Sequence, residues 1–353
     1  MLNVYLDPSS YRYLSNNLFD ENNKYLGDDF FAAFRYLKTY CWEKDINLNT
    51  VDFWSDEKSC KSDVYLTIDH KGLFRRLYWH FIKNKKYPTV SLEKFSRKIL
   101  FQFEPPLIMP DVYSKINRVL EKYDKAYFYD SANFTHKSKN LKCGDLLMYQ
   151  SYDKEFEEYW KNSDRKFLAI ISSNKSPRPI KKVLAQICCG FNPIYLGYKE
   201  LLSKRIEIID FFGKNDEIDV YGNGWEKLPL VKKYYKGSVE DRLKKLSEYK
   251  FAITFENSAV PGFITERIFD AFYAGTIPIY LGAPNIEKYI PKNCFVDMRD
   301  FKNCEELRSF LKSLSDSDIE IYRKNIQNFF KSGKFRPFSK ECLAEKIVNA
   351  IQQ

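Results

Sequence analysis

The chain has 353 residues and a formal net charge of +10, with 44% hydrophobic and 29% charged residues. These values are ordinary for a globular protein, and the length predicts two domains. Because no window of about 18 apolar residues occurs, the sequence predicts no membrane-spanning helix. The eight cysteines and three histidines lack the spacing of a zinc site, so we expect free thiols.

Strand and helix patterns alternate from the N-terminus to about residue 149. Such alternation predicts a parallel sheet covered by helices on both faces. The expected strands are Asn3 to Leu6, Val64 to Ile68, Lys98 to Phe103 and Ala126 to Tyr129, and the expected helices are Asp29 to Glu43, Leu73 to Phe81 and Tyr113 to Tyr123. The charged and aromatic segment from Ser151 to Asp164 is the predicted linker between two lobes.

A second series of strand and helix patterns follows this linker. Its expected strands are Phe167 to Ser172, Ile218 to Tyr221, Phe251 to Phe255 and Ile277 to Leu281, and its expected helices are Tyr198 to Phe212, Ser238 to Tyr249, Ile264 to Phe272, Ile319 to Phe330 and Glu341 to Ile351. Residues Pro177 to Tyr195 form an insertion that contains Cys188 and Cys189. We therefore predict an α/β protein with two lobes, residues 1–160 and 161–353, the second closed by the last helices.

The stretch from Phe251 to Gly282 has the order strand, loop, helix, strand. Ligands gather where the strand of such a unit meets its helix, and the free N–H groups of a helix start favour phosphate. The residues Glu256, Asn257, Glu266 and Arg267 lie in this loop and helix start. The sequence therefore predicts a binding site for an anionic ligand here.

Three motifs stand within this stretch: Phe255-Glu256-Asn257-Ser258, Phe263-Ile264-Thr265-Glu266-Arg267-Ile268 and Pro278-Ile279-Tyr280-Leu281-Gly282. Together they resemble the α1,3/4-fucosyltransferases of glycosyltransferase family 10, which transfer fucose from GDP-fucose. The resemblance runs from about Lys98 to Ile351 and is weakest in the first 95 residues, where acceptor recognition would lie. It implies a GT-B-type fold with two facing Rossmann-like lobes, the donor being held mainly by the C-terminal lobe.

The resemblance also implies an inverting reaction and two catalytic carboxylates. The general base would be Glu104, which stands in Phe103-Glu104-Pro105-Pro106 and would take the proton of the acceptor hydroxyl. From the residues alone, Glu104 is equally a surface glutamate at a strand end. Glu266 would bond the fucose hydroxyls and favour the positive charge that develops on the sugar ring.

The donor would be held by residues of the C-terminal lobe. Arg205 and Arg267 would stabilise the departing diphosphate, because a guanidinium binds phosphate with two hydrogen bonds and stays protonated. Arg205 follows the insertion, and the alternative is that it belongs to a solvated helix face. The other residues that the resemblance places at the donor are Glu256, Asn257, Phe263, Ser173, Asn174 and Tyr221.

Two further motifs have competing interpretations. Tyr221-Gly222-Asn223-Gly224-Trp225 contains two glycines of a dinucleotide fingerprint, but Lys227 stands at the place of the third, so we interpret it as a turn beside the nucleotide. Asp316-Ser317-Asp318 has the form of a cation-binding triplet. It precedes a predicted helix, however, and Ser315 with Asp318 makes a capping box the favoured interpretation.

We expect GDP-fucose as the donor and a glycan hydroxyl as the acceptor, with α1,3 linkage to GlcNAc or Glc. This scheme requires no cofactor. It allows a divalent cation, but one without a structural role. The alternatives are the same fold with another nucleotide sugar, or a basic nucleic-acid-binding protein. Because no signal peptide or anchor is apparent, we expect a cytoplasmic bacterial or viral enzyme with, at most, peripheral membrane contact.

Overall fold

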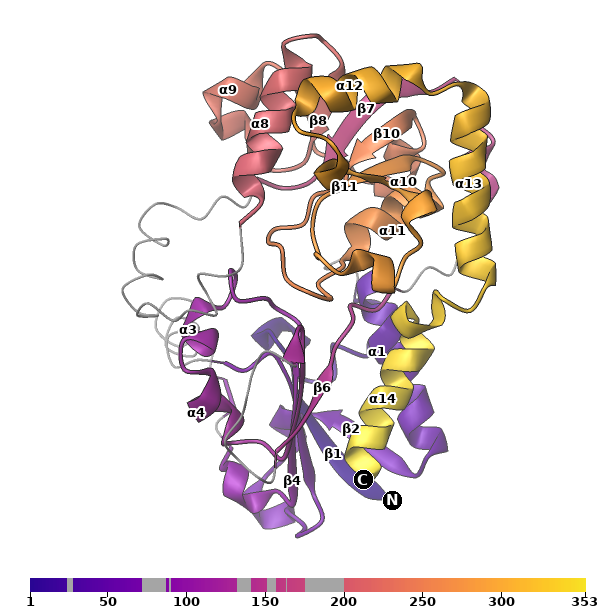
Figure 1. Ribbon diagram of the computed structural model, residues 1–353. Coiled ribbons are helices and arrows are strands. Elements are labelled where there is room, and N and C mark those ends of the chain that lie inside the picture. The colour runs from indigo at the N-terminus through magenta and orange to yellow at the C-terminus, as the bar shows by residue number, and fades with distance from the viewer. Residues whose placement is uncertain are drawn as a thin grey trace. The chain divides into compact units, whose positions relative to one another are not determined.

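The computed structural model describes residues 1–23, 28–71, 87–88, 90–131, 141–150, 157–162, 164–174 and 200–353. The chain folds into two compact units (Figure 1). The first is formed by the described parts of Met1–Asp153 together with Arg336–Gln353, and the second by the described parts of Lys154–Lys182 and Tyr198–Phe335. Each unit is built around one six-stranded sheet.

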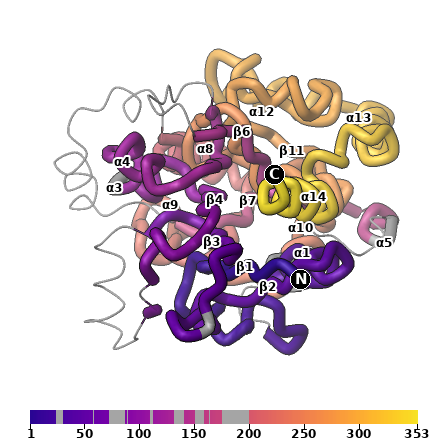
Figure 2. The backbone as a smooth tube through the Cα atoms, turned by 90° about the horizontal axis from the view of Figure 1, so that it is seen from below, coloured from indigo at the N-terminus to yellow at the C-terminus, as the bar shows by residue number. Residues whose placement is uncertain are grey.

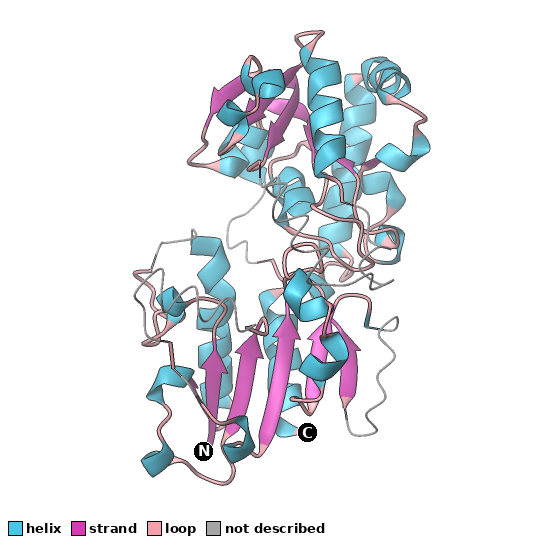
Figure 3. Cartoon of the chain, turned by 90° about the vertical axis from the view of Figure 1, so that its left-hand side faces the viewer, coloured by secondary structure: helices cyan, strands magenta, loops and turns pink. Residues whose placement is uncertain are grey.

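The sheet of the first unit has the strand order β2-β1-β3-β4-β5-β6, and every neighbouring pair is parallel (Figure 3). The central strand β3 is buried at all five positions, as expected for a parallel sheet that is covered on both faces. The strands are β1 Leu2–Asp7, β2 Ile46–Thr50, β3 Val64–Ile68, β4 Arg97–Gln102, β5 Lys125–Phe128 and β6 Lys142–Asp145.

The first unit also contains the last helix of the chain. The helix α14, Lys340–Gln352, lies beside α1, Asp28–Glu43 (Figure 2). Leu37 of α1 and Ile347 and Ile351 of α14 are fully buried in one apolar core with β1 and β3. The short helices α3, Pro110–Tyr113, and α4, Ile116–Leu120, complete the described helices of this unit.

The placement of α14 differs from the expected one, in which the last helices close the second lobe. Two basic side chains of the first sheet bind its final carbonyl groups: Lys125 Nζ donates to the oxygen of Ala350 at 2.8 Å, and the guanidinium of Arg97 donates to the oxygen of Ile351. The sequence pattern identified an amphipathic helix, but amphipathicity does not specify which core receives the apolar face.

The sheet of the second unit has the order β12-β11-β10-β7-β8-β9 and is also entirely parallel. Its strands are β7 Lys166–Ile171, β8 Ile218–Tyr221, β9 Tyr235–Gly237, β10 Tyr249–Ile253, β11 Ile277–Tyr280 and β12 Val296–Asp297. Its helices are α5 Glu157–Trp160, α8 Leu202–Gly213, α9 Pro229–Lys232, α10 Arg242–Leu246, α11 Glu266–Tyr273, α12 Cys304–Ser313 and α13 Asp316–Lys331. The two parallel sheets confirm the predicted α/β class.

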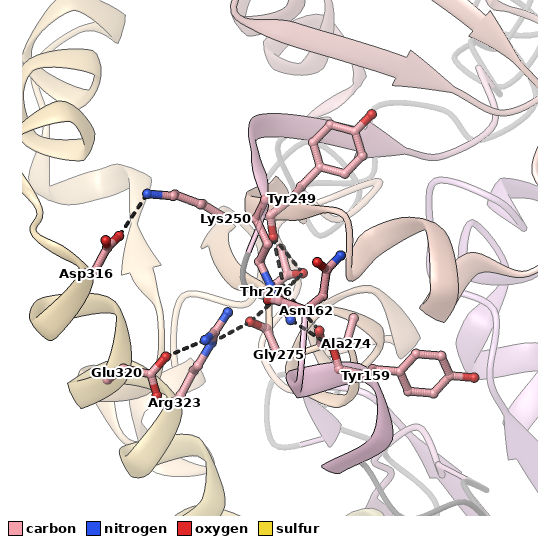
Figure 4. Close-up of polar contacts among 11 residues, drawn as sticks. Tyr159, Asn162, Tyr249, Lys250, Ala274, Gly275, Thr276, Asp316, Glu320 and Arg323 are labelled. Carbon is pink, nitrogen blue, oxygen red and sulfur yellow. Dashed lines mark hydrogen bonds and ion pairs between the residues drawn. The ribbon is translucent and has the colours of Figure 1, made fainter.

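The amino edge of the second sheet is held by Arg165, which directly precedes β7. Its guanidinium donates to five main-chain carbonyl oxygens, those of Tyr159, Asn162, Tyr249, Ala274 and Gly275, at 2.9–3.3 Å. Figure 4 shows these carbonyl groups converging, with Arg323 of α13 bonding Gly275 from the other side. Binding three separate segments at one cation fixes the starts of β7, β10 and β11 relative to one another.

Several local expectations are changed by the structure. The helix expected from Tyr113 to Tyr123 is split into α3 and α4, because Lys115 between them has non-helical angles of φ −121° and ψ 28°. The strands β2, β6, β9 and β12 and the helix α12 were not predicted. The helix expected from Leu73 to Phe81 and the insertion from Pro177 to Tyr195 lie outside the described residues.

The triplet at Asp316-Ser317-Asp318 caps α13. The Ser315 side chain accepts from the Asp318 N–H while the Asp318 carboxylate accepts from the Ser315 N–H, which confirms the capping box. Across the described part of the chain, no group of His, Cys, Asp or Glu side chains is arranged to hold a metal ion. Nor does any helix there have the length and apolar character needed to cross a bilayer.

Candidate functional site

The carboxyl edge of the second sheet gathers four loops. The strands β11, β10, β7 and β8 are consecutive neighbours in this parallel sheet, so their carboxyl ends share one edge. The loops that follow them begin at Leu281, Thr254, Ser172 and Gly222. In open α/β sheets, ligands bind in the crevice at this edge.

Glu256 is the buried centre of the loop after β10. Its carboxylate accepts hydrogen bonds from the Thr265 N–H, the Thr265 hydroxyl and Arg267 Nη1, each at 2.8 Å. A Cβ added to Gly282 would lie only 2.5 Å from Glu256 Cγ, so glycine is required where the chain after β11 passes Glu256. Burial raises the pKa of Glu256, while Arg267 opposes this shift. Glu256 therefore ties the loop to the start of α11.

Glu266 and Arg267 form the first turn of α11 and are both half-buried. Burial would raise the pKa of Glu266, but Arg267 and Arg242 outweigh it and lower the pKa. Burial would lower the pKa of Arg267, but Glu266 and Glu256 outweigh it and raise that pKa. Both side chains are therefore charged at neutral pH, beside the positive end of the helix dipole.

Arg205 of α8 is buried beside the same loop, with only 1% of its surface exposed. Its Nε donates to the oxygen of Phe255 at 3.1 Å, and its Nη2 donates to Asn257 Oδ1 at 3.0 Å. Nη1 has no hydrogen-bond partner among the described residues. Burial and, next, the charge of Arg267 lower its pKa to about 9. The interpretation of Arg205 as part of a solvated helix face is therefore wrong.

The loops after β7 and β8 pack against each other. The Asn174 N–H donates to the oxygen of Asn223 at 2.9 Å, and Asn174 Nδ2 donates to the oxygen of Gly224 at 3.3 Å. Gly222 has φ +113°, and a Cβ there would lie 2.3 Å from the oxygen of Ser172. The two-glycine motif is thus a tight turn at the carboxyl edge, as predicted.

Three of the predicted donor residues offer little exposed polar surface to a ligand. The Tyr221 hydroxyl lies 2.8 Å from the Tyr249 hydroxyl, which in turn donates to Asp219, so this side chain belongs to a buried network of the sheet. Phe263 is buried, and Ser173 is half-buried next to the turn. Their contact with a donor stays a prediction.

Glu104 belongs to the first unit, where it follows β4 and is half-buried. It therefore stands at the carboxyl edge of its own parallel sheet, which is the edge expected for a functional residue. Its main chain is bound by the side chains of Asp69, Gln102 and Tyr113.

Residues 197–332, which contain all of the second-sheet edge except the β7 loop, match the family described as glycosyltransferase family 10 (fucosyltransferase), C-terminal part. We refer to residues 197–332, which match this family model, as the family 10 region. The chain is 42% identical over 77 residues to the alpha-(1,3)-fucosyltransferase FucT of Helicobacter pylori. This match covers 22% of this chain and 16% of that protein. An alpha-(1,3)-fucosyltransferase B of Drosophila melanogaster is 31% identical over 155 residues, 42% of this chain and 34% of its own length.

The matches therefore span about a third or less of these curated relatives. Over the whole chain, a crystal structure of an alpha1,3-fucosyltransferase is similar with a TM-score of 0.54 at 15% identity, covering 100% of this chain and 90% of that one. An alpha,alpha-trehalose-phosphate synthase from Burkholderia xenovorans gives a TM-score of 0.51 at 7% identity, covering 90% and 77%. These likenesses confirm the predicted GT-B-type fold class.

Two residues of the family 10 region were missed by the sequence analysis. Thr265 supplies both an N–H and a hydroxyl to Glu256, and Trp225 donates its Nε1 hydrogen to the oxygen of Ser172 at 2.6 Å. Both residues lie inside motifs quoted above, so their place in these motifs was the signal that could have identified them. The partner of Trp225 is 53 positions away and that of Thr265 is nine positions away across a loop, so both contacts depend on the fold and could not be read from the sequence.

Proposed function

We propose that the protein is an inverting fucosyltransferase, which transfers L-fucose from GDP-β-L-fucose to a hydroxyl group of an acceptor glycan. The observation that carries the proposal is that Arg205 and Arg267 lie near enough to each other, at the carboxyl edge of the second sheet and inside the family 10 region, for the charge of Arg267 to lower the pKa of Arg205. Two neighbouring cations in a largely buried setting favour a ligand that carries several negative charges, as a nucleoside diphosphate does.

Arg205 and Arg267 would stabilise the diphosphate as it gains charge on leaving. Arg205 offers Nη1, since Phe255 and Asn257 already use its other nitrogens. Arg267 is oriented by Glu256 and by the Thr265 hydroxyl, both at 2.8 Å. Cations held in place before the reaction stabilise developing charge without further reorganisation. The scheme therefore uses protein cations at the diphosphate and requires no cofactor.

Two glutamates would fill the remaining roles, which are binding of the fucose and removal of the acceptor proton. Glu266, whose pKa is lowered by Arg267 and Arg242 against the effect of burial, is ionised and would accept hydrogen bonds from fucose hydroxyls. Glu104 would remove the acceptor proton as the hydroxyl attacks the anomeric carbon. Glu256 would contribute through Arg267, because Thr265 and Arg267 already bond its carboxylate.

The acceptor class is taken from relatives. The mouse 4-galactosyl-N-acetylglucosaminide 3-alpha-L-fucosyltransferase 9 is 32% identical over 146 residues, which is 40% of this chain and 35% of that protein. A 4-galactosyl-N-acetylglucosaminide is therefore the acceptor we would assay first, with α1,3 linkage as the expected product. The cytoplasmic location and peripheral membrane contact stay predictions.

The donor is tested by measuring thermal stability with GDP, GDP-fucose, UDP-sugars and CMP-sugars. A ligand at about 100 times its Kd should raise the free energy of unfolding by roughly 2.7 kcal/mol. We expect this effect for GDP and GDP-fucose only. Equal or larger stabilisation by UDP-sugars would favour the alternative that the fold uses another nucleotide sugar.

A further inference from the structure

The side chain of Asp69 binds two successive main-chain N–H groups, those of Phe103 and Glu104. Asp69 directly follows β3, and its Oδ1 accepts from the Phe103 N–H at 2.7 Å and from the Glu104 N–H at 2.9 Å. The same oxygen accepts from Gln102 Nε2 at 3.0 Å. One carboxylate oxygen of the residue after β3 thus binds three groups at the end of the neighbouring strand β4.

The carbonyl group of Glu104 is held as firmly as its N–H. Its oxygen accepts from Gln102 Nε2 at 3.2 Å and from the Tyr113 hydroxyl at 3.2 Å. Pro105 follows and fixes its own φ angle. Both main-chain polar groups of Glu104 are therefore bound by side chains, from Asp69 after β3, Gln102 of β4 and Tyr113 of α3.

Asp69 itself is held in an uncommon conformation. Its φ is +58°, in the left-handed region, and only 3% of its surface is exposed. Its own N–H donates to the oxygen of Phe101 at 2.8 Å, so the main chain of Asp69 is bonded to β4 as well as its side chain. Aspartate adopts the left-handed region more readily than most residues, and here hydrogen bonds of both its main chain and its side chain hold it there.

We propose that Asp69 is a positioning residue, which fixes the Glu104 carboxylate where it can take the acceptor proton. The inference rests on the proposed function, in which Glu104 is the general base. A base must lie within hydrogen-bond reach of the proton that it removes, and a displacement of about 1 Å can lower the rate about 10²-fold. Loss of the Asp69 carboxylate frees both N–H groups, so the strand end and its glutamate would move.

The test compares Asp69→Asn and Asp69→Gly with Asp63→Asn. Glycine removes the carboxylate but tolerates a positive φ, and asparagine keeps an oxygen acceptor and also tolerates the left-handed region. Asp63 is the matched control, because it is a fully buried aspartate that directly precedes β3 and accepts the Cys60 N–H at 2.9 Å. It stands at the amino end of the strand whose carboxyl end carries Asp69.

The assay uses GDP-fucose and a 4-galactosyl-N-acetylglucosaminide. We expect Asp69→Gly to lower kcat about 10–10²-fold with GDP affinity and donor KM unchanged, and Asp69→Asn to restore part of the loss. In a Glu104→Gln background, Asp69→Gly should cause no further loss, since no base remains to be positioned. Asp63→Asn should lower thermal stability and leave kcat unchanged.

Amide hydrogen exchange supplies a readout that does not depend on activity. The Phe103 and Glu104 amides should be protected in the wild-type chain and should exchange faster in Asp69→Gly. The inference is overturned if Asp69→Gly keeps wild-type kcat, or if its loss is equally large in the Glu104→Gln background. A wild-type chain that leaves GDP-fucose unused, or a Glu104→Gln variant with full turnover, would instead overturn the proposed function.

Discussion

The two arginines of the second-sheet edge differ in how much of each guanidinium is already engaged. Arg205 is buried and bonds the loop after β10 through two of its nitrogens, so it is as much a part of the fold as of the site. Arg267 is half-buried and is paired with Glu256, a carboxylate with no exposed surface. Removal of Arg267 would thus leave a buried charge without its cation, which is strongly destabilising.

This pairing gives a prediction for Arg267→Lys and Arg267→Ala. Lysine keeps a cation for both Glu256 and the diphosphate, so this variant should retain much of its GDP affinity and stability. Alanine should weaken GDP binding by roughly 1.5–3 kcal/mol, the usual contribution of a hydrogen bond to a charged group, and should also lower the melting temperature. GDP titration by calorimetry and thermal unfolding measure the two effects.

Arg308→Ala is the matched control. Arg308 also pairs with a partly buried glutamate, Glu217, at 2.7 Å, but Glu217 directly precedes β8 at the amino end of the sheet. This variant should lose stability and keep its GDP affinity. If Arg267→Lys and Arg267→Ala bind GDP equally well, Arg267 does not contact the diphosphate.

Strands with a strong local pattern were predicted correctly, and strands without one were missed. The strand predicted from Val64 to Ile68 has the same bounds as β3, because five strand-forming residues stand in a row. The strands β2 and β6, with the sequences INLNT and KCGD, carry few apolar residues and form only through their neighbours. Pairing with a distant strand is a tertiary effect, which a local pattern does not contain.

The same limit applies to the candidate site. Resemblance located the motif residues Glu256, Glu266 and Arg267, because the motifs that contain them are continuous stretches of the sequence. Asp69 was not, because its significance lies in hydrogen bonds to residues more than 30 positions away, at the end of another strand. Registers between strands decide such contacts, and the sequence alone did not supply them.

The attachment of α12 to the sheet predicts a dependence of stability on pH. Arg308 Nε and Nη2 both donate to the Glu217 carboxylate at 2.7 Å, and Lys312 pairs with it at 2.5 Å. Hydrogen bonds from Arg308 and, after the opposing effect of burial, from Lys312 lower the pKa of Glu217. Since the pKa is lower in the folded state, this stabilisation is present above the unfolded value of about 4.3 and is lost as pH falls through the folded pKa.

Urea unfolding between about pH 6 and pH 3 measures this dependence. The wild-type chain should lose stability more steeply below about pH 4.3 than Glu217→Gln, which has no proton to gain at this position. Glu305→Gln is the control, because Glu305 also faces Arg308, at 3.5 Å, with 62% of its side chain exposed. An exposed pair of this kind contributes little, so its pH profile should follow that of the wild type. Parallel profiles for wild type and Glu217→Gln would contradict the prediction.

The first unit combines β1 to β6 with α14, which follows the whole second unit in the chain. Residues of α14 fill the core between α1 and the first sheet, and Ile347 is fully buried there. We expect Ile347→Ala to lower the free energy of unfolding by about 2–5 kcal/mol, as is usual for such truncations in a core. The exposed Asn349, two residues on, gives the control Asn349→Ala.

Hydrogen exchange identifies where the loss falls. In Ile347→Ala, protection should decrease in β1 and β3 of the first unit and stay unchanged in β7 and β10 of the second. Asn349→Ala should leave both sets of amides as they are. A uniform decrease across all four strands would show that the two units unfold as one.

The position of α14 also sets the order in which the protein can be completed during synthesis. A ribosome produces β1 to β6 first, but the helix that closes their core is translated only after every strand and helix of the second unit. The second unit has all its described elements in one run from α5 to α13 and can fold while the chain is still being made. The core of the first unit gains α14 only after the second unit has been translated, so in this stretch of chain the earlier unit is completed after the later one.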